Sequence, residues 1–381
     1  MTIFLYVFYH IIILLFIILC SIRISKTSSK RYWSYAFIPI TIYAIEEGMR
    51  WGRSSDWPNY LEVYNQIGHG DRQEFEILFY VFWRLFSFTG LPYPFVITAC
   101  SFLLIFSLFY FSKDYKRYLW LLIPLLVVWI SPKSIQFVRW FIGYSVFIIG
   151  YTKFLNQKRV IPLVIMISSI FFHYGLVLFV FFAFIVSYIK TPLLRPIYPI
   201  IGSLLLILIF NIELLQNLTM LSQVFLHSGT ERFDEYTKNP EYWLQANFET
   251  KSKVWYIINM LPLYSYLWIF YKCLDSRKMV VFYNIAIVGL ILRSISSGIE
   301  IMDRYAICFD AFFVIASVVS FCYLREQYHK GILRTILLLI FTISFVTQSY
   351  KFCKPLEDEK QMHYYWETDL PSVNSVWNSY K

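Results

Sequence analysis

Long, nearly continuous apolar runs, separated by short basic stretches, dominate the sequence. A helix needs roughly 17 to 25 apolar residues to cross a bilayer, and many runs reach or approach that length. The runs lack the alternation of apolar and polar positions that is typical of an outer-membrane β-barrel. Because backbone groups in hydrocarbon must be hydrogen-bonded internally, the pattern predicts an all-α, polytopic integral membrane protein.

Six short connections between the apolar runs are basic, and the positive-inside rule places such loops in the cytoplasm. They are Arg23 to Arg31, Lys113 to Arg117, Lys153 to Arg159, Lys190 to Arg195, Lys272 to Lys278 and Arg325 to Arg334. With all six inside, the chain crosses twelve times and both termini lie outside. The predicted crossings are 3–22, 33–48, 94–112, 118–131, 134–154, 160–172, 175–189, 196–212, 253–272, 279–297, 305–323 and 335–350.

One further apolar segment, EFEILFYVFWRLFSF at residues 74–88, is too short to count as a crossing. Counting it would also move the basic stretch KDYKR to the outside. We therefore predict a half-membrane or interfacial helix near residues 74–90. Glu76 and Arg84 stand about two helical turns apart and can share one face of it.

No Gly/Ser-rich or Pro-rich linker and no internal repeat divides the chain, which predicts a single transmembrane domain over residues 1–350. Two long loops, 49–75 and 213–252, and a tail over 351–381 are expected outside. The six cysteines show no CxxC pair or metal-ligand spacing, so neither disulfides nor zinc is indicated. The formal net charge of +10 is scattered between apolar segments, which favours a role in membrane orientation over nucleic-acid binding.

The predicted topology gathers the polar residues of the apolar regions on one side. On the outer face or in the outer half of the membrane lie Arg50, Arg53, Asp56, Glu76, Arg139, His173, Arg293, Asp303 and Arg304. His173 falls where the chain turns between two crossings, with Gly175 beside it as a residue suited to a tight turn. None of these residues set the topology, so their gathering predicts a site that opens outward.

Arginines carry most of this candidate site. Arg50, Arg53 and Asp56, with Tyr60, are spaced so that a loop could cradle an anion, because guanidinium groups bind phosphate oxygens in a fork. Alternatively, this is a solvated loop whose arginines meet lipid headgroups. Arg139 lies inside a predicted crossing, where a charge costs about 2.5 to 3.5 kcal/mol, so it faces the bundle or snorkels to the headgroups.

The remaining candidates have structural alternatives too. His173 could act as a base, or could bond a carbonyl of a neighbouring helix and stay neutral. A metal site is not expected, because no second ligand stands at metal-ligand spacing on the same helix. Arg304 and Asp303 could form a structural ion pair at the membrane edge, whereas Arg293 lies deeper. The loop 213–252 is polar and aromatic, which suits sugars or any interfacial loop.

Five motifs together resemble one known family. RWGRSSDWPNY, FEILFYVF, FVRWFIGYSVF, IFFHYGLVLF and DRYAICF follow one another between about residues 47 and 309. In order and spacing, the chain resembles EpsG-family, Wzy-type polymerases of bacterial O-antigen and exopolysaccharide. The family pattern falls on Arg50, Gly52, Asp56, Tyr60, Glu76, Arg139, Phe172, His173, Arg304 and Tyr305. Trp140 stands where the family usually has glutamine, and Ser54 and Ser55 replace part of a glycine-rich approach to Asp56.

The resemblance implies a GT-C-like architecture and an enzyme of the bacterial inner membrane with its active site facing the periplasm. It implies a metal-independent glycosyltransferase, without cofactor, that joins glycan repeat units carried on undecaprenyl pyrophosphate. Catalytic candidates are His173, then Asp56 and Glu76. Pyrophosphate-binding candidates are Arg139 and Arg304, with Arg50, Arg53 and Arg293; Tyr60 and Tyr305 are substrate-binding candidates. A chain-length regulator and a flippase of the same pathway are possible partners.

Three other functions fit part of the pattern. A flippase for lipid-linked oligosaccharides would carry membrane arginines, but should expose polar residues to both faces and often shows an internal repeat. A membrane O-acyltransferase with a catalytic histidine would need a donor from the cytoplasm or a channel for it. An O-antigen ligase is the hardest to separate from a polymerase.

Overall fold

The computed structural model describes residues 3–52, 54, 56–70, 75–157, 159–209, 253–295, 300–326, 331–353, 363–368, 370–373 and 376. The chain divides into two compact units, which we describe separately. Unit 1 comprises Met1–Phe181 and Thr342–Lys381, and unit 2 comprises Phe182–Phe341. The expected loop 213–252 lies outside the described residues.

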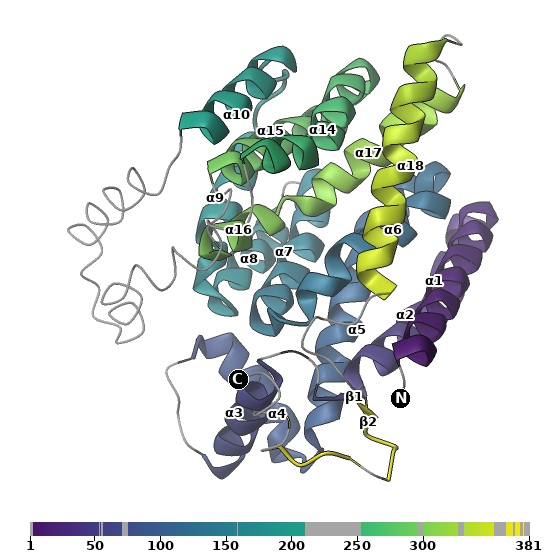
Figure 1. The fold of residues 1–381 in the computed structure, drawn as a ribbon. Helices are drawn as coiled ribbons and strands as arrows, with labels where there is room; N and C mark the ends of the chain where they lie inside the picture. The colour runs from purple at the N-terminus through teal and green to yellow at the C-terminus, as the bar shows by residue number, and fades with distance from the viewer. Residues whose placement is uncertain are drawn as a thin grey trace. The chain divides into compact units, whose positions relative to one another are not determined.

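Unit 1 is built from helices and one short strand pair (Figure 1). Its helices are α1 (Ile3–Lys26), α2 (Tyr32–Gly48), α3 (Trp57–His69), α4 (Ile77–Phe88), α5 (Tyr93–Ser112), α6 (Leu119–Ser134), α7 (Val138–Gln157) and α8 (Val160–Ser168). Its strands are β1 (Arg50–Trp51) and β2 (His363–Tyr364). Helix α7 packs against α5 and α8, and α2 packs against α5. Most residues of α6 and α7 are buried, so these two helices lie in the interior of the unit.

Unit 2 contains α10 (Ile197–Ile209), α14 (Lys253–Phe270), α15 (Arg277–Ile295), α16 (Glu300–Ile307) and α17 (Asp310–Glu326). Helix α15 packs against α10, α16 and α17, and α14 packs against α17. Two helices continue from one unit into the other: α9 (Val177–Val186) and α18 (Ile332–Cys353).

A helix overlaps each of the twelve predicted crossings, which confirms the all-α expectation. The predicted crossing 305–323 falls across two helices, α16 and α17. By length and hydropathy, four described helical stretches could span a bilayer: Val7–Lys26, Tyr93–Ser134, Arg277–Ile295 and Ile332–Cys353. The stretch Tyr93–Ser134 holds two predicted crossings, joined by a 3-10 segment with a non-helical residue at Tyr115. The number of crossings, and the single-domain organisation, stay predictions.

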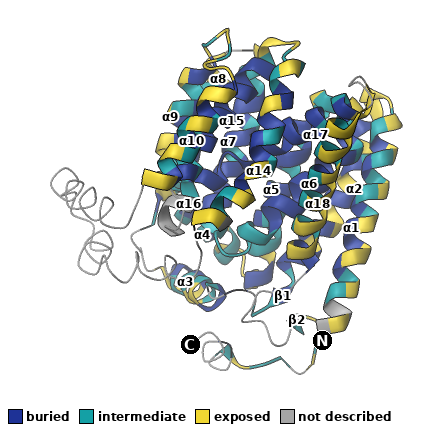
Figure 2. Ribbon diagram, turned by 45° about the horizontal axis from the view of Figure 1, so that its top comes forward, coloured by how far each residue is buried: buried dark blue, intermediate teal, exposed yellow. Residues whose placement is uncertain are grey.

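Large apolar side chains are exposed along several helices. In Figure 2, exposed residues appear as yellow segments of the ribbon, for example on α18 and α10. On α18 these include Ile332, Leu339, Ile343 and Val346. Water would strongly disfavour so much apolar surface, whereas lipid would not. The chain is therefore a membrane protein in which these faces contact hydrocarbon.

The short segment before α5 forms the 12-residue helix α4, as the sequence predicts. Glu76 and Arg84, which were expected to be able to share one face, contact different elements. Glu76 precedes the first turn, where it contacts residues of α7 and the segment before α9. Arg84 instead donates to the carbonyl oxygens of Ile67 and of Gly68, the latter at 3.0 Å, at the end of α3. A guanidinium thereby satisfies carbonyls that a helix end leaves without partners.

The expected loop 49–75 contains the helix α3, which sequence analysis did not predict. Its buried residues Trp57, Tyr64 and Ile67 recur at helical spacing and pack against Phe79 and Trp83 of α4. Gly70 ends the helix with a left-handed φ of 94°, a conformation that favours glycine. The expected loop therefore contains a helix whose buried, mostly aromatic side chains pack against α4.

The C-terminal tail, expected only as an outer extension, pairs with the same loop. Strand β2 lies beside β1 (Figure 1). The two strands are antiparallel, with Arg50 opposite Tyr364. The indole N–H of Trp51 donates to the carbonyl of Pro371 at 3.0 Å. Gly52 adopts a φ of 67°, and Val376 packs where its Cβ would point. Residues more than 300 positions apart therefore build one structure.

Candidate functional site

Glu76 is the centre of a polar cluster in unit 1. Its Oε1 lies 2.8 Å from Nδ1 of His173 and accepts a hydrogen bond from the backbone N–H of Tyr174 at 3.3 Å. Its Oε2 accepts a hydrogen bond from Nη1 of Arg139 at 3.2 Å. The structure thus brings together three predicted site residues, of which the first and the last, Glu76 and His173, lie 97 positions apart along the chain.

Breaks between helices position all three side chains. Glu76 occupies the N-cap position of α4, and Arg139 lies in the first turn of α7. His173 stands between two 3-10 turns with an extended backbone, φ −159° and ψ 114°. The helical run is therefore interrupted at His173, while the predicted reversal between two crossings stays a prediction. Side chains at such breaks project beyond the packed helices, and His173 and Arg139 keep 24% and 22% of their side chains exposed.

The cluster keeps Glu76 ionised. Burial opposes ionisation, but the hydrogen bond from His173 and the charge of Arg139 outweigh it and lower the pKa of Glu76 to about 2. A carboxylate of such low basicity is a poor proton acceptor near neutral pH. It is well suited to orient the imidazole and to stabilise a positive charge on it.

The indole ring of Trp140 packs against the imidazole ring of His173. Its ring meets the His173 ring edge-on, with 4.7 Å between centroids. Gly175 makes room for this indole, because a Cβ there would stand 2.4 Å from Cζ3 of Trp140. Gly175 does not have a positive φ, so the predicted reason for this glycine, a tight turn, is not the one that the structure shows. Close approach of an aromatic ring excludes a larger residue.

Two predicted residues of α3 adjoin the cluster. Tyr60 interacts with Arg139, and burial raises the pKa of the Tyr60 phenol while the Arg139 charge opposes that rise. Asp56 occupies the N-cap position of α3, is half-buried and makes no side-chain capping bond. Asp56 also acts electrostatically on Tyr60, so it belongs to the same neighbourhood.

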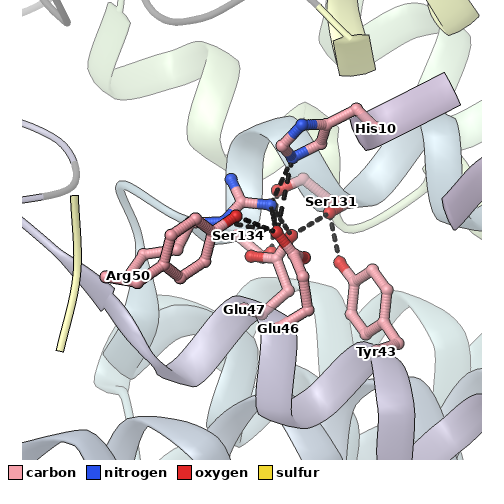
Figure 3. A network of polar contacts seen from close by, with 8 residues as sticks. His10, Tyr43, Glu46, Glu47, Arg50, Ser131 and Ser134 are labelled. Carbon is pink, nitrogen blue, oxygen red and sulfur yellow. Dashed lines mark hydrogen bonds and ion pairs between the residues drawn. The ribbon is translucent and has the colours of Figure 1, made fainter. Parts of the chain in front are cut away.

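Arg50 forms a second, more deeply buried network, drawn in Figure 3. Its Nε donates to Oε1 of Glu46 at 2.7 Å, and its Nη2 donates to Oε1 of Glu47 at 3.2 Å and contacts Nε2 of His10. The hydroxyl of Tyr364 donates to Oε1 of Glu46 at 3.1 Å. The side chains of Arg50 and His10 are each only 1% exposed. Arg50 is therefore balanced by carboxylates inside the protein.

Three predicted residues lie in unit 2. Arg293, near the end of α15, forms an ion pair with Asp310, a fully buried residue at the start of α17. Arg304 and Tyr305 are partly buried residues of α16. The side chain of Asp303 lies outside the described part of the chain, as does Arg53, so their roles stay predictions.

Sequence reasoning missed four polar partners: Glu46, Glu47, His10 and Asp310. Glu46 and Glu47 were visible as an acidic pair at the end of an apolar run, four and three residues before Arg50, which is the spacing of neighbours on a helix. Asp310 and His10 are single polar residues within apolar runs, and such residues need partners inside a membrane. Within the described residues, no group of three or more His, Cys, Asp or Glu side chains could hold a metal ion.

Comparison with known proteins places most of the chain in one family. A family model described as "EpsG family" matches residues 33–365. The match includes both the Glu76 cluster and most of the Arg50 network. Neither the curated proteins nor the solved structures include a match.

Proposed function

The chain belongs to the EpsG family, and from this premise we propose that it is a polysaccharide polymerase of the bacterial inner membrane. The proposed enzyme joins glycan repeat units carried on undecaprenyl pyrophosphate, at the periplasmic face, in O-antigen, capsule or exopolysaccharide synthesis. A GT-C-like arrangement of twelve crossings and partnership with a flippase and a chain-length regulator belong to the same proposal.

The proposed reaction is a single displacement at an anomeric carbon. A hydroxyl of the acceptor repeat unit attacks that carbon, the bond from carbon to the pyrophosphate oxygen breaks, and the hydroxyl proton passes to a base. The lipid pyrophosphate leaves as an anion, so fixed cations lower the barrier. The leaving group is already activated, and the reaction therefore calls for neither a nucleotide sugar nor a metal. A single displacement inverts the anomeric centre.

One observation carries this assignment: the hydrogen bond between Glu76 and Nδ1 of His173. Because an ionised carboxylate only accepts hydrogen bonds, Nδ1 carries the proton and Nε2 of the neutral ring holds the lone pair. Nε2 then takes the acceptor proton, and Glu76 stabilises the resulting imidazolium, as in other carboxylate–histidine pairs. His173 is thus the proposed base, with Glu76 orienting it.

Arg139 and Arg304 are the proposed ligands of the pyrophosphate, with Arg53 and Arg293 as further candidates. Arg139 is partly exposed beside the base, which supports this role. The pairing of Arg50 with Glu46 and Glu47 instead favours a supporting role for Arg50. Tyr60 and Tyr305 are proposed to contact sugar, and Asp56 is the alternative base.

The test is reconstitution of the purified protein with synthetic lipid-linked repeat units, in the absence of nucleotide and metal. A ladder of glycans that disappears with His173→Ala is the expected result. Vesicles that scramble the lipid-linked glycan without forming a ladder would instead identify a flippase. Transfer of a single preformed chain to a lipid acceptor would identify a ligase.

A further inference from the structure

Trp366 presents an exposed indole ring on the C-terminal tail of unit 1. The residue is 60% exposed, and one face of its ring stacks on the buried Tyr364, with 4.4 Å between the centroids and 7° between the planes. Because Tyr364 covers one face, the opposite face of the indole is the open one. A single exposed apolar residue needs no explanation by itself, but this one is held in a fixed position.

Three contacts hold the indole in that position. The hydroxyl of Tyr364 donates to Oε1 of the buried Glu46 at 3.1 Å, which anchors the covered side of the stack. The backbone N–H of Glu367 donates to the carbonyl of Tyr364 at 2.9 Å and closes a turn around Trp366. The Glu367 carboxylate accepts from the backbone N–H of Tyr364 at 3.1 Å and lies 2.8 Å from Nδ1 of His363. A surface that is already rigid loses little entropy when a ligand binds.

The chemistry around the open face favours a neutral ligand rich in hydroxyl groups. The face of an aromatic ring carries partial negative charge and attracts the partly positive C–H groups on the face of a sugar ring. Glu367, with 29% of its side chain exposed, can accept hydrogen bonds from hydroxyls and repels anions, including anionic lipid headgroups. A cation would have to compete with His363 for Glu367, whose two oxygens already accept hydrogen bonds.

The indole also adjoins the aromatic cluster that surrounds the candidate site. Its chain neighbour Tyr365 packs edge-on against Trp51 with 4.9 Å between the centroids, and Trp51 contacts Trp57 at 4.8 Å. Trp57 belongs to the buried cluster against which Tyr60 packs. A glycan bound at Trp366 would therefore lie on the same aromatic structure that supports Tyr60.

We propose that Trp366 is a docking site for a neutral sugar ring of the glycan, separate from the residues that carry out the reaction. The proposal rests on the proposed function, because it takes the glycan of that reaction as the ligand. The indole stacks on the C–H face of one pyranose ring, and Glu367 accepts hydrogen bonds from its hydroxyls. A second contact raises the effective concentration of the growing chain at the enzyme between additions, which favours longer products.

The binding test uses full-length protein in nanodiscs and needs no turnover. Saturation-transfer NMR measures the binding of cellohexaose, whose rings carry equatorial hydroxyls and present C–H groups on both faces. The matched anionic probe is the hexamer of glucuronic acid with the same linkage. We expect saturable binding of cellohexaose, weaker binding of the anionic hexamer, and no displacement of cellohexaose by excess choline. Absence of cellohexaose binding, equal binding of both hexamers, or displacement by choline would overturn the proposal.

Variants locate the binding at Trp366. Trp366→Ala removes the stacking surface and is expected to weaken cellohexaose binding about fivefold. Trp268→Ala, at an exposed position of α14, should leave the binding unchanged. Trp366→Phe keeps a smaller ring, so its binding should be intermediate, and it serves as the test if Trp366→Ala fails to fold. Undiminished binding in the folded Trp366 variants would overturn the proposal.

A paramagnetic test separates a sugar site from a membrane anchor. Fluorotryptophan is incorporated, and the fluorine resonance of Trp366 is assigned from its absence in Trp366→Phe. We expect a water-soluble gadolinium chelate to broaden this resonance and cellohexaose to shift it. Broadening by spin-labelled lipid instead would identify an interfacial tryptophan and overturn the proposal.

Product length distinguishes this proposal from the proposed function. In the reconstituted reaction, Trp366→Ala should shift the glycan ladder to shorter products while the rate of the first addition stays unchanged. A ladder of unchanged length would overturn the docking proposal alone. Protein that binds cellohexaose through Trp366 but makes no ladder would refute the proposed function alone.

Discussion

Unit 1 contains two clusters built from the same residue types, an arginine, a histidine and one or two glutamates, and they differ in solvent exposure. The Glu76 cluster joins Arg139 and His173, which keep about a fifth to a quarter of their side chains exposed. In the Arg50 network, the side chains of His10, Glu46 and Arg50 are at most 2% exposed. Composition alone therefore does not distinguish the proposed catalytic cluster from the supporting one; the exposure of the side chains does.

The clearest test of this difference replaces the histidine of each cluster with alanine. His173→Ala removes the proposed base and is expected to lower polymerase turnover about 100- to 10,000-fold, the usual effect of losing a general base. His10→Ala removes a partner of Arg50 and should reduce the amount of folded protein while the folded fraction still turns over. Turnover per folded molecule, with folding measured by detergent size-exclusion chromatography, separates the two. Equal loss of turnover in both variants would refute the distinction.

The two arginines should differ in their effect on thermal stability. Arg50→Ala leaves Glu46 and Glu47 buried without their cation, and breaking a buried pair in this way costs about 3 to 5 kcal/mol of stability. Arg139→Ala leaves only Glu76, which His173 still contacts, so the thermal midpoint should fall much less. Thermal unfolding in nanodiscs measures both variants. A smaller loss for Arg50→Ala than for Arg139→Ala would contradict the assignment of Arg50 to support.

Trp140 and Gly175 allow a test in which a second substitution restores turnover lost through the first. Gly175→Ala places a methyl against the six-membered ring of Trp140 and should displace the His173 imidazole, lowering turnover about tenfold, which corresponds to about 1.4 kcal/mol of barrier. Trp140→Phe removes the contacted atoms, so the double variant should recover part of that turnover. Gly202→Ala, at a helical glycine with open space around it, is the control. Additive losses in the double variant would show that the two residues act independently.

Acid unfolding tests the electrostatics of Glu76. Its pKa falls from the ordinary 4.5 to about 2 in the folded protein, so its stabilising contribution is fully present above about pH 4.5 and is lost as pH falls toward 2. Glu76→Gln should therefore flatten the loss of stability over that window. Between pH 5 and 8 the carboxylate stays ionised, and its removal should shift the acid limb of turnover to lower pH, because the imidazolium loses its anion. Unchanged acid unfolding in Glu76→Gln would contradict the low pKa.

The smallest effect on turnover is expected at Tyr364. Tyr364→Phe removes one hydrogen bond to Glu46, a charged acceptor, and should cost about 1.5 to 3 kcal/mol at most without altering turnover of the folded fraction. Tyr350→Phe, on an exposed face of α18, is the matched control. A stability equal to that of the control would show that the tail does not support the Arg50 network.

The sequence predicted the helices well because apolar runs of sufficient length have few alternatives in a bilayer. It also predicted Glu76, Arg139 and His173, since charged or titratable residues stand out in apolar surroundings. It could not predict that Glu76 faces His173, because the contact joins elements 97 positions apart. The two-residue strand β2 has no periodic signal, whereas the spacing of Trp57, Tyr64 and Ile67 could have revealed α3.

The pairing of β1 with β2 also orders events during biosynthesis. Arg50 leaves the ribosome well before its strand partner Tyr364, which is synthesised 314 residues later. During that interval Glu46 has its contact with Arg50 but lacks the hydrogen bond from Tyr364. A fusion tag placed immediately after residue 363, or a premature stop before it, would therefore disturb the pairing of β2 with β1.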